Sequence, residues 1–208
     1  MTDADRQPAL NDKPNASARR SSRASLTPET WIEAATELLV VNGIDAVRVD
    51  VISKILNVTR GSFYWHFKDR DDLLQHVLET WRKTTTEQII ERFDKHQDAP
   101  KLLFKELLSL PFRGRAAARA ANIELAIRAW ARRDQMARYA VDQVDARRLA
   151  YIAQCFSALG FPMAEARERA FMLYSYEVAE SILSHQGNAA QKRARSELVE
   201  RLLLKRLD

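Results

Sequence analysis

The sequence predicts an all-α protein of about nine helices, and three observations lead to this fold class. Apolar residues recur at intervals of three and four along most of the chain, which is the spacing of helices with one buried face. The 208 residues include only five glycines and six prolines, and helix-favouring residues such as Ala, Leu, Arg and Glu are abundant. No run of alternating apolar and polar residues indicates a strand. A chain of this length can bury a sizeable core in one or two domains.

The first 24 residues are expected to be a disordered basic arm. They are rich in Asp, Asn, Pro, Ser, Ala and Arg and contain few large apolar side chains, so they cannot bury enough surface to offset the entropy lost on ordering. Residues 25–74 are expected to form a first helical domain, and residues 75–208 a second one.

The first helix is predicted over residues 28–42. Thr27 is a suitable N-cap, and Pro28 follows it at the first helical position, where proline is favoured. Gly43 comes directly after Asn42 and can end the helix with a positive φ. The side chains expected to face the core are Ile32, Ala35, Leu38 and Leu39.

Two further helices, separated by a three-residue turn, are predicted next. Residues 49–56 form the first of them, and its apolar positions are Val51, Ile52, Ile55 and Leu56. Residues 57–59 form the turn, in which Asn57 is suited to a positive φ. This arrangement is typical of a helix-turn-helix motif, in which the first helix braces the second and the second enters the major groove of DNA.

The second helix of this motif is short and has two unlike faces. Thr59 is a good N-cap, whose hydroxyl could accept from the backbone N–H of Gly61 or Ser62. Phe63 and Phe67 are four residues apart, so they share a face that should be buried. The opposite face presents Arg60, Ser62, Tyr64 and His66, with Trp65 on the flank and Lys68 just past the end. A helix of barely two turns is unstable alone, so the neighbouring helices must hold it.

Residues 26–74 resemble the DNA-binding domain of the TetR (tetracycline-repressor-like) family of bacterial transcriptional regulators. The features that carry the resemblance are the first amphipathic helix ending in Asn42-Gly43, the bracing helix around Ile52, the turn, and the runs TRGSFYWHF and KDRDDLL. The resemblance implies that Tyr64, His66 and Arg70 grip phosphates. It also implies that Arg60 and Ser62 lie nearest the bases. The full set of expected DNA-binding residues is Arg48, Thr59, Arg60, Ser62, Tyr64, Trp65, His66, Lys68 and Arg70.

The sequence departs from the family pattern at two places. Leu56 and Asn57 stand just before the turn, where the family has Ala and Gly, so the local packing is expected to be bulkier. Arg48 stands at the usual Ser or Thr N-cap of the bracing helix, which removes a cap and offers a phosphate contact.

The net charge of +5 is weak evidence for nucleic-acid binding, because residues 26–74 carry five basic and eight acidic side chains. The positions of the charged side chains matter more than their net charge. The acidic residues fall mainly on the outer face of the first helix or at helix N-termini, where the helix dipole favours them, whereas the basic residues surround the short helix. Arg19, Arg20 and Arg23 in the arm could contact phosphates or a minor groove, or could be a solvated tail.

A long helix is predicted to link the two domains. It opens at Asp69 as N-cap, with Asp71 and Asp72 in its first turn, and its apolar residues continue to Phe93. Further helices are predicted from Pro100 onward, and then over residues 115–132, 134–159, 162–186 and 189–207.

The resemblance implies that the second domain binds a small-molecule effector. Aromatic residues that could line a mostly apolar pocket are Trp81, Phe104, Phe112, Trp130, Tyr139, Tyr151, Phe156, Tyr174 and Tyr176. The alternative is that these aromatics are ordinary core residues. Glu124, Arg128 and Glu177 could be polar anchors for a ligand or part of a solvated face. A ligand that prefers a conformation with wrongly spaced recognition helices would release the operator.

The last two helices carry more apolar surface than one partner requires, which favours a homodimer. The residues expected at the interface are Phe171, Tyr174, Val178, Ile182, Leu198 and Leu202. They could instead complete the core of one chain, and the resemblance is what favours the four-helix interface. A dimer would bring two recognition helices to a pseudo-palindromic operator in double-stranded DNA.

Catalysis, metal binding and a cofactor are not expected. The four histidines, His66, His76, His96 and His185, have no Cys or carboxylate partner at metal-site spacing, and no glycine-rich phosphate loop or nucleophile elbow occurs. Cys155 is the single cysteine and cannot form an internal disulfide, so it is either a core thiol or a redox sensor. With no membrane-spanning run, the protein is expected in the cytoplasm with the nucleoid. The alternative function is a helical protein-binding adaptor without sequence-specific DNA binding.

Overall fold

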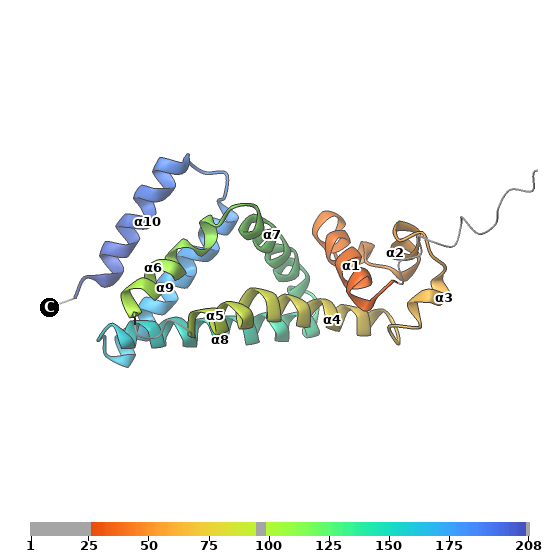
Figure 1. The fold of residues 1–208 in the computed structure, drawn as a ribbon, viewed down its shortest axis with the longest axis horizontal. Helices are drawn as coiled ribbons and strands as arrows, with labels where there is room; N and C mark the ends of the chain where they lie inside the picture. The colour runs from red at the N-terminus through yellow and green to blue at the C-terminus, as the bar shows by residue number, and fades with distance from the viewer. Residues whose placement is uncertain (1–25, 95–98, 207–208) are drawn as a thin grey trace, which may run out of the picture.

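The computed structural model describes residues 26–94 and 99–206, and these residues contain helices and no strands, which confirms the predicted fold class. The expected arm, residues 1–24, lies outside the described residues. The elements are α1 (Pro28–Asn42), η1 (Ile44–Ala46), α2 (Val49–Ile55), α3 (Arg60–Phe63), α4 (Arg70–Arg82), η2 (Lys83–Glu87), α5 (Gln88–Asp94), α6 (Pro100–Ser109), η3 (Leu110–Phe112), α7 (Gly114–Ala131), α8 (Gln135–Ala158), α9 (Met163–Ile182) and α10 (Ala189–Leu204). The molecule is elongated, with α1 to α3 at one end and α10 at the other (Figure 1).

Helix α1 begins and ends where the sequence predicts. Thr27 is the N-cap residue in an extended conformation, although its side chain makes no capping hydrogen bond, and Pro28 is the first helical residue. Gly43 has a φ of +79°, and its N–H donates to the Leu39 carbonyl at 3.0 Å. A residue with a Cβ would be strained at this positive φ, so glycine is what lets the chain turn into η1.

A first hydrophobic core joins α1, α2, α3 and α4, and it continues into α7 and α8. Trp31, Ile52 and Phe63 are completely buried in it, together with Leu73 from α4. Ile127 from α7 packs in the same cluster, as do Trp130 from α7 and Val141 and Val144 from α8. The N-terminal helices therefore share one core with the beginning of the C-terminal bundle, so movement of α7 or α8 is felt by α1 and α4.

The predicted linking helix is one long rod built from α4, η2 and α5 (Figure 1). Asp69 caps it, as predicted, by accepting from the Asp72 N–H at 2.9 Å. The rod has a π-helical segment at η2 that the sequence pattern does not reveal. Within η2, the Thr84 and Thr85 hydroxyls donate to the carbonyls of Thr80 and Trp81, at 2.8 and 2.7 Å. Such back-bonding to the preceding turn loosens regular helix hydrogen bonding.

A second core lies at the far end, among α5, α6, α8 and α9. Phe104 and Phe156 are completely buried, with ring centroids 5.3 Å apart at a steep angle. Helix α10 contributes one fully buried apolar residue to this core, Leu203. Arg169, which is buried on α9, donates to the Leu203 and Lys205 carbonyls at 2.6 and 2.7 Å and so fastens the end of α10. Most of α10 therefore remains open to solvent.

Ion pairs reinforce the contact between α7 and the N-terminal helices. Arg119 on α7 pairs with Glu37 on α1, and Glu33 lies 3.4 Å from the same guanidinium. Arg133, just after α7, pairs with Asp45 of η1 at 2.7 Å. Both pairs are exposed, and such pairs contribute little stability each, about 0–1 kcal/mol. These pairs accompany the apolar packing of α7 against α1, which holds the two helices together.

Candidate functional site

The exposed polar face of α3 is the first candidate site. Thr59 stands at the N-cap position, but the predicted side-chain cap is wrong, because its hydroxyl makes no capping bond. Its backbone oxygen accepts instead from the Ser62 N–H at 3.0 Å. The helix is also shorter than predicted and spans Arg60–Phe63, after which the chain continues as a turn. A single turn cannot hold itself, so packing beneath it sets its position.

The packing beneath α3 is aromatic, as the sequence predicts. Phe63 is completely buried and Phe67 is 2% exposed, and their rings stack with centroids 5.5 Å apart. Trp31 of α1 meets Phe63 edge-on, with ring centroids 5.4 Å apart. Above this layer Tyr64 is 60% and Trp65 87% exposed. The predicted division of the segment into a buried phenylalanine face and an outward polar face is therefore confirmed.

The other predicted residues of the segment lie around this outward face. Arg60, Thr59 and Lys68 are exposed, and Ser62 and His66 are half-buried. The turn before α3 has the predicted conformation, since Asn57 has a φ of +54°. The Val58 N–H then donates to the Ser53 carbonyl at 3.0 Å, which ties the turn to α2.

Acidic groups beside this face are used to cap α4. Asp69 accepts from the Asp72 N–H, and Asp72 accepts from the Lys68 N–H at 2.8 Å. These carboxylates therefore neutralise the helix N-terminus, where the dipole favours them. The formally acidic composition of the domain thus does not prevent a basic and aromatic surface on α3.

Two arginines of the expected DNA-binding set have partners within the chain. Arg48 is exposed and lies 3.4 Å from Asp50, so it is loosely held. Arg70 donates from Nε to the Val47 carbonyl at 2.6 Å and from Nη2 to the Ile44 carbonyl at 2.9 Å. Its side chain is half-buried and ties α4 to η1. A phosphate contact by Arg70 stays a prediction, and it would have to use the outer edge of the guanidinium beside Asp71.

The second candidate site is a cavity of about 330 Å³ in the C-terminal bundle. Its walls come from η2, α5, α6, η3, α7, α8 and α9, with apolar residues such as Ile89, Ile90, Leu107, Ala117, Ala120, Ile152 and Val178. A cavity of this size with mostly apolar walls and a few polar groups is typical of a small-molecule site.

The sequence predicted only part of the cavity lining. Of the expected aromatics, Tyr151 and Tyr174 line it. Trp81, Phe104, Trp130 and Phe156 are buried core residues and do not line it. Tyr139 is 67% exposed on the outer side of α8, and Phe112 lines a separate cavity of about 830 Å³ beneath α10. Tyr176 is half-buried and lines neither cavity. Trp81, Phe104, Trp130 and Phe156 are therefore ordinary core residues, whereas Tyr139 and Phe112 are exposed.

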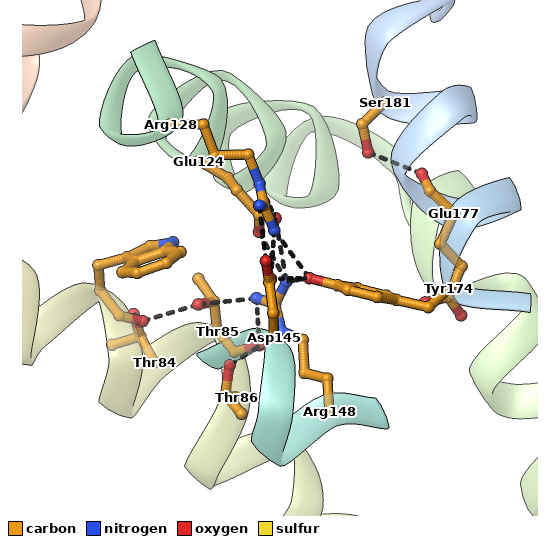
Figure 2. Close-up of polar contacts among 11 residues, drawn as sticks. Thr84, Thr85, Thr86, Glu124, Arg128, Asp145, Arg148, Tyr174, Glu177 and Ser181 are labelled. Carbon is orange, nitrogen blue, oxygen red and sulfur yellow. Dashed lines mark hydrogen bonds and ion pairs between the residues drawn. The ribbon is translucent and has the colours of Figure 1, made fainter. Parts of the chain in front are cut away.

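Three residues that line the cavity, Glu124, Arg148 and Tyr174, belong to a charged cluster (Figure 2). Arg128 of α7 pairs bidentately with Asp145 of α8, with N–O distances of 2.6 and 3.0 Å, and also donates to Glu124 at 2.8 Å. Arg148 of α8 donates from Nη1 to the two Glu124 oxygens at 3.1 and 2.8 Å. The Tyr174 hydroxyl donates to Asp145 at 2.6 Å and accepts from both arginines.

The π-helical segment η2 completes this cluster. Arg148 donates from Nε to the Thr86 hydroxyl at 3.0 Å and from Nη2 to the Thr85 carbonyl at 3.3 Å. The irregular turn thus supplies acceptors that a regular helix would use internally. The cluster joins the linking rod to α7, α8 and α9.

Burial and pairing compete in setting the pKa values of the cluster. Burial alone would raise the pKa of Asp145, but hydrogen bonds from Arg128 and Tyr174 outweigh it and hold that pKa below its usual value. Burial likewise opposes the charge on Arg148, yet the attraction of Glu124 outweighs it and raises the arginine pKa. Asp145 therefore stays anionic and Arg148 stays cationic.

Glu177 and Cys155 differ from this paired cluster. Glu177, on α9, lines the cavity, and burial raises its pKa to about 8. Cys155 is buried, and desolvation raises its thiol pKa to about 12. A thiol that holds its proton so firmly is a core residue, and the redox-sensor alternative is not supported.

Sequence reasoning anticipated Glu124, Arg128 and Glu177 but missed Asp145, Arg148 and the three threonines of η2. The sequence contains a pattern from which the two α8 residues, Asp145 and Arg148, could have been predicted. Val141, Val144, Arg148 and Ile152 follow helical spacing, so Arg148 lies in a buried stripe, with Asp145 beside it. Charged residues at buried positions of a helix indicate a paired network.

The outer face of α9 and α10 is the third candidate site. Phe171, Ile182, Leu198 and Leu202 are between 47% and 62% exposed, and Met172 and Leu183 are exposed too. Two members of the expected dimer set point elsewhere. Tyr174 is 8% exposed within the charged cluster, and Val178 lines the cavity, so these two side chains do not belong to this exposed face. The two residues lie on the inner edge of a helix that is apolar on more than one side.

Comparison with known proteins supports the N-terminal resemblance. Residues 32–77 match the sequence model of the family described as bacterial regulatory proteins, tetR family. The transcriptional regulator AcrR of Shigella flexneri is 30% identical over 92 residues, which are 44% of this chain and 43% of AcrR. The regulator SrpR of Pseudomonas putida is 37% identical over 60 residues, 29% of this chain and 28% of SrpR. The matches thus span less than half the length of these relatives, and no enzyme family is among these findings.

Similar solved structures cover nearly the whole chain and support the fold. A tetR-family regulator from Mesorhizobium loti has a TM-score of 0.64 and 21% identity, covering 91% of this chain and 97% of that one. FadR from Bacillus subtilis, solved with stearoyl-CoA, has a TM-score of 0.62 and 19% identity, covering 86% and 99%.

Among the described residues, no helix is long and apolar enough to cross a membrane. No group of three potential metal ligands occurs within residues 26–94 and 99–206. Residues 32–77 thus match the tetR family of bacterial regulatory proteins, and the described chain shares the all-helical fold of the similar solved structures.

Proposed function

We propose that this protein is a transcriptional repressor that binds a pseudo-palindromic operator as a homodimer and releases it when a small molecule binds. The observation that carries the proposal is the position of α3, whose phenylalanines are buried while Arg60, Tyr64 and Trp65 face solvent. A short helix whose apolar side is held by packing can present its polar side to the major groove of DNA. Domain boundaries at residues 25–74 and 75–208 are part of the proposal.

The roles within this surface follow from side-chain type and exposure. Arg60 and Ser62, at the N-terminal end of α3, would reach base edges, because a recognition helix enters the groove with this end. Tyr64, His66 and Lys68 would contact phosphates, which position the domain and contribute affinity that falls with salt. Arg48, Thr59, Trp65 and Arg70 complete the proposed surface.

The outer face of α9 and α10 is the proposed dimer interface, with Phe171, Ile182, Leu198 and Leu202 at its centre. These large apolar side chains are exposed on both helices. An isolated subunit is expected to leave less apolar surface in contact with water. Pairing them with the same helices of a second chain by a two-fold axis would form a four-helix interface. That axis would also place two copies of α3 for two half-sites.

The 330 Å³ cavity is the proposed effector site, and α7 is the proposed link to DNA binding. Ala117, Ala120 and Glu124 of α7 line the cavity, while Arg119 of the same helix pairs with Glu37 of α1. Ile127 and Trp130 extend α7 into the core beneath α1 and α4. A ligand that prefers one position of α7 would bias the spacing of the two recognition helices by its differential affinity.

Structural relatives with bound small molecules support a ligand-responsive interpretation. FadR from Bacillus subtilis was solved with stearoyl-CoA, and a regulator from Saccharomonospora viridis, with a TM-score of 0.61 and 17% identity, was solved with choline. These ligands belong to those proteins. The partners proposed here are an operator in double-stranded DNA, a second copy of this chain and an effector, which would place the protein in the cytoplasm with the nucleoid.

The test is selection of binding sites from a random duplex pool by the full chain. The expected result is an inverted repeat with half-sites about one helical turn apart, bound with an affinity that falls steeply between two salt concentrations. Enrichment of no sequence would overturn the proposal. It would leave the helical adaptor, whose complexes with DNA should show no sequence preference.

A further inference from the structure

One carboxyl group of the cavity, that of Glu177, has an oxygen without a hydrogen-bond partner among the described residues. Glu177 lines the cavity from α9, and this oxygen, Oε1, is buried. The backbone oxygen of Glu177 accepts from the Ser181 hydroxyl at 3.0 Å, so the nearest hydroxyl on its own helix is used elsewhere. Buried polar groups are nearly always satisfied, and one that is not indicates a missing ligand or water.

The charged groups that face Glu177 are committed to one another. Arg148, from α8, donates to both oxygens of Glu124 and to Thr86. Glu124, from α7, carries the same sign as an ionised Glu177. Tyr174, on the same helix as Glu177, is hydrogen-bonded to Asp145. Once Arg148 and Glu124 cancel, an ionised Glu177 leaves the inner end of the cavity with one surplus negative charge.

Two positively charged residues of the lining are exposed to solvent. Arg92 of α5 and Arg113, between η3 and α7, both line the cavity and are exposed. Arg113 donates to the Ser109 hydroxyl at 3.2 Å, and its guanidinium lies 5.9 Å from the centroid of the Phe93 ring. Solvent screens these exposed charges more strongly than it screens the buried Oε1 atom of Glu177. The buried carboxyl is therefore the stronger determinant of ligand charge.

Building on the proposed effector site, we propose that the cavity binds an apolar organic cation, such as a protonated or quaternary amine, whose nitrogen pairs with the Glu177 carboxylate. The apolar remainder of the ligand would pack on the aliphatic walls from α5, α7 and α8. A cation supplies the charge that the chain lacks, whereas an anion would place two like charges in a cavity of low polarity. A neutral ligand leaves the carboxyl either protonated or unpaired.

The titration of Glu177 gives the proposal a second signature. Burial raises the pKa of Glu177 to about 8, with Arg148 opposing this shift and Glu124 adding to it. The carboxyl therefore holds a proton in the empty cavity at pH 7 and releases it when it pairs with a cation. Cation affinity should rise with pH up to about 8, by at most about tenfold per pH unit.

The experiment is calorimetric titration of the full chain, without DNA, with three ligands that share a ten-carbon chain: decyltrimethylammonium, decanol and decanoate. A quaternary cation has no proton of its own, so any proton released comes from the protein. Decyltrimethylammonium is expected to bind at least about tenfold more tightly than the other two, and to release about one proton at pH 7, seen as a heat that depends on the buffer.

Two variants make the result specific. Glu177→Gln keeps the shape of the side chain and should reduce the preference for the cation to within about threefold and abolish proton release. Glu168→Gln changes an exposed carboxylate on the same helix and should behave as wild type. Circular dichroism confirms that each variant is folded.

Three outcomes would overturn the proposal: tightest binding of decanoate, equal cation binding by Glu177→Gln and wild type, or no binding of decyltrimethylammonium up to about 1 mM. Operator binding by the same preparation is measured separately. Intact operator binding with any of these outcomes rejects the cation site alone, whereas loss of operator selectivity with intact cation binding rejects the proposed function.

Discussion

The Arg70 guanidinium donates from Nε to the backbone oxygen of Val47 at 2.6 Å, and this bond fastens the start of α4 to the end of η1. A second bond, from Nη2 to the Ile44 carbonyl at 2.9 Å, makes the contact two-pronged. Both bonds hold the segment that precedes α2. Arg70 therefore positions the helix-turn-helix motif as well as standing beside its proposed DNA surface.

Replacing Arg70 should consequently affect stability. Arg70→Ala is expected to lower the free energy of unfolding by about 1.5–3 kcal/mol, because two backbone carbonyls lose a charged donor. Urea unfolding followed by circular dichroism measures this loss. An unchanged unfolding free energy, combined with weaker operator binding and a smaller salt slope, would show that Arg70 acts mainly on phosphates.

The pair of Glu124 and Arg148 should show strong coupling. Both side chains are mostly buried, with N–O distances of 2.8 and 3.1 Å, and removing Arg148 would leave two partly buried carboxylates, Glu124 and Asp145, to share Arg128. Arg148→Met is expected to destabilise the protein by about 3–5 kcal/mol. Adding Glu124→Gln should restore part of that loss. A double-mutant cycle with additive effects would contradict the coupling.

The raised pKa of Glu177 predicts a specific dependence of stability on pH. The carboxyl keeps its proton up to about pH 8 in the folded protein but loses it near 4.5 when unfolded. Between these values the folded state binds more protons, so this group makes stability fall as pH rises, by at most about 1.4 kcal/mol per unit.

The Glu177→Gln variant isolates this effect, because other groups titrate equally in both proteins. Its free energy of unfolding relative to wild type should increase steadily from pH 5 to about pH 8, measured by urea unfolding at several pH values. A constant difference across this range would mean that Glu177 titrates normally in the folded protein.

The outer face of α10 should determine the oligomeric state. Leu202 is 58% exposed there, and a charge at the centre of an apolar interface is poorly tolerated. Leu202→Glu is expected to give a folded monomer in sedimentation velocity and to weaken operator binding. Val41→Glu is the control, since Val41 is an exposed apolar residue on α1. Equal masses for the Leu202 variant and wild type would refute the interface.

The sequence predicted the N-terminal helices well because interactions between residues close in the chain determine their ends, the turn and their buried faces. Pro28 and Gly43 mark the ends of α1, Asn57 takes the positive φ of the turn, and the spacing of Phe63 and Phe67 divides the segment into two faces. Each of these features depends on neighbours within a few residues. Such signals are present in one sequence without an alignment.

Long-range contacts explain what the sequence did not reveal. The π-helical turn at Thr85 exists together with Arg148, which lies 63 residues later and takes its carbonyl. Tyr174 has the spacing of an interface residue but turns toward Asp145, and Arg70 meets carbonyls from a segment more than twenty residues earlier. The apolar spacing along one helix cannot show which of its two apolar sides packs inside the chain and which faces outward.

The outward face of α3 is tested most directly by titrating a selected operator duplex with four variants and following fluorescence anisotropy. Tyr64→Ala and Arg60→Ala are expected to weaken binding by at least about tenfold without changing the unfolding free energy. Their matched controls, Tyr139→Ala and Arg167→Ala, remove an equally exposed tyrosine and arginine elsewhere and should bind as wild type does. Wild-type affinity in both α3 variants would contradict the account.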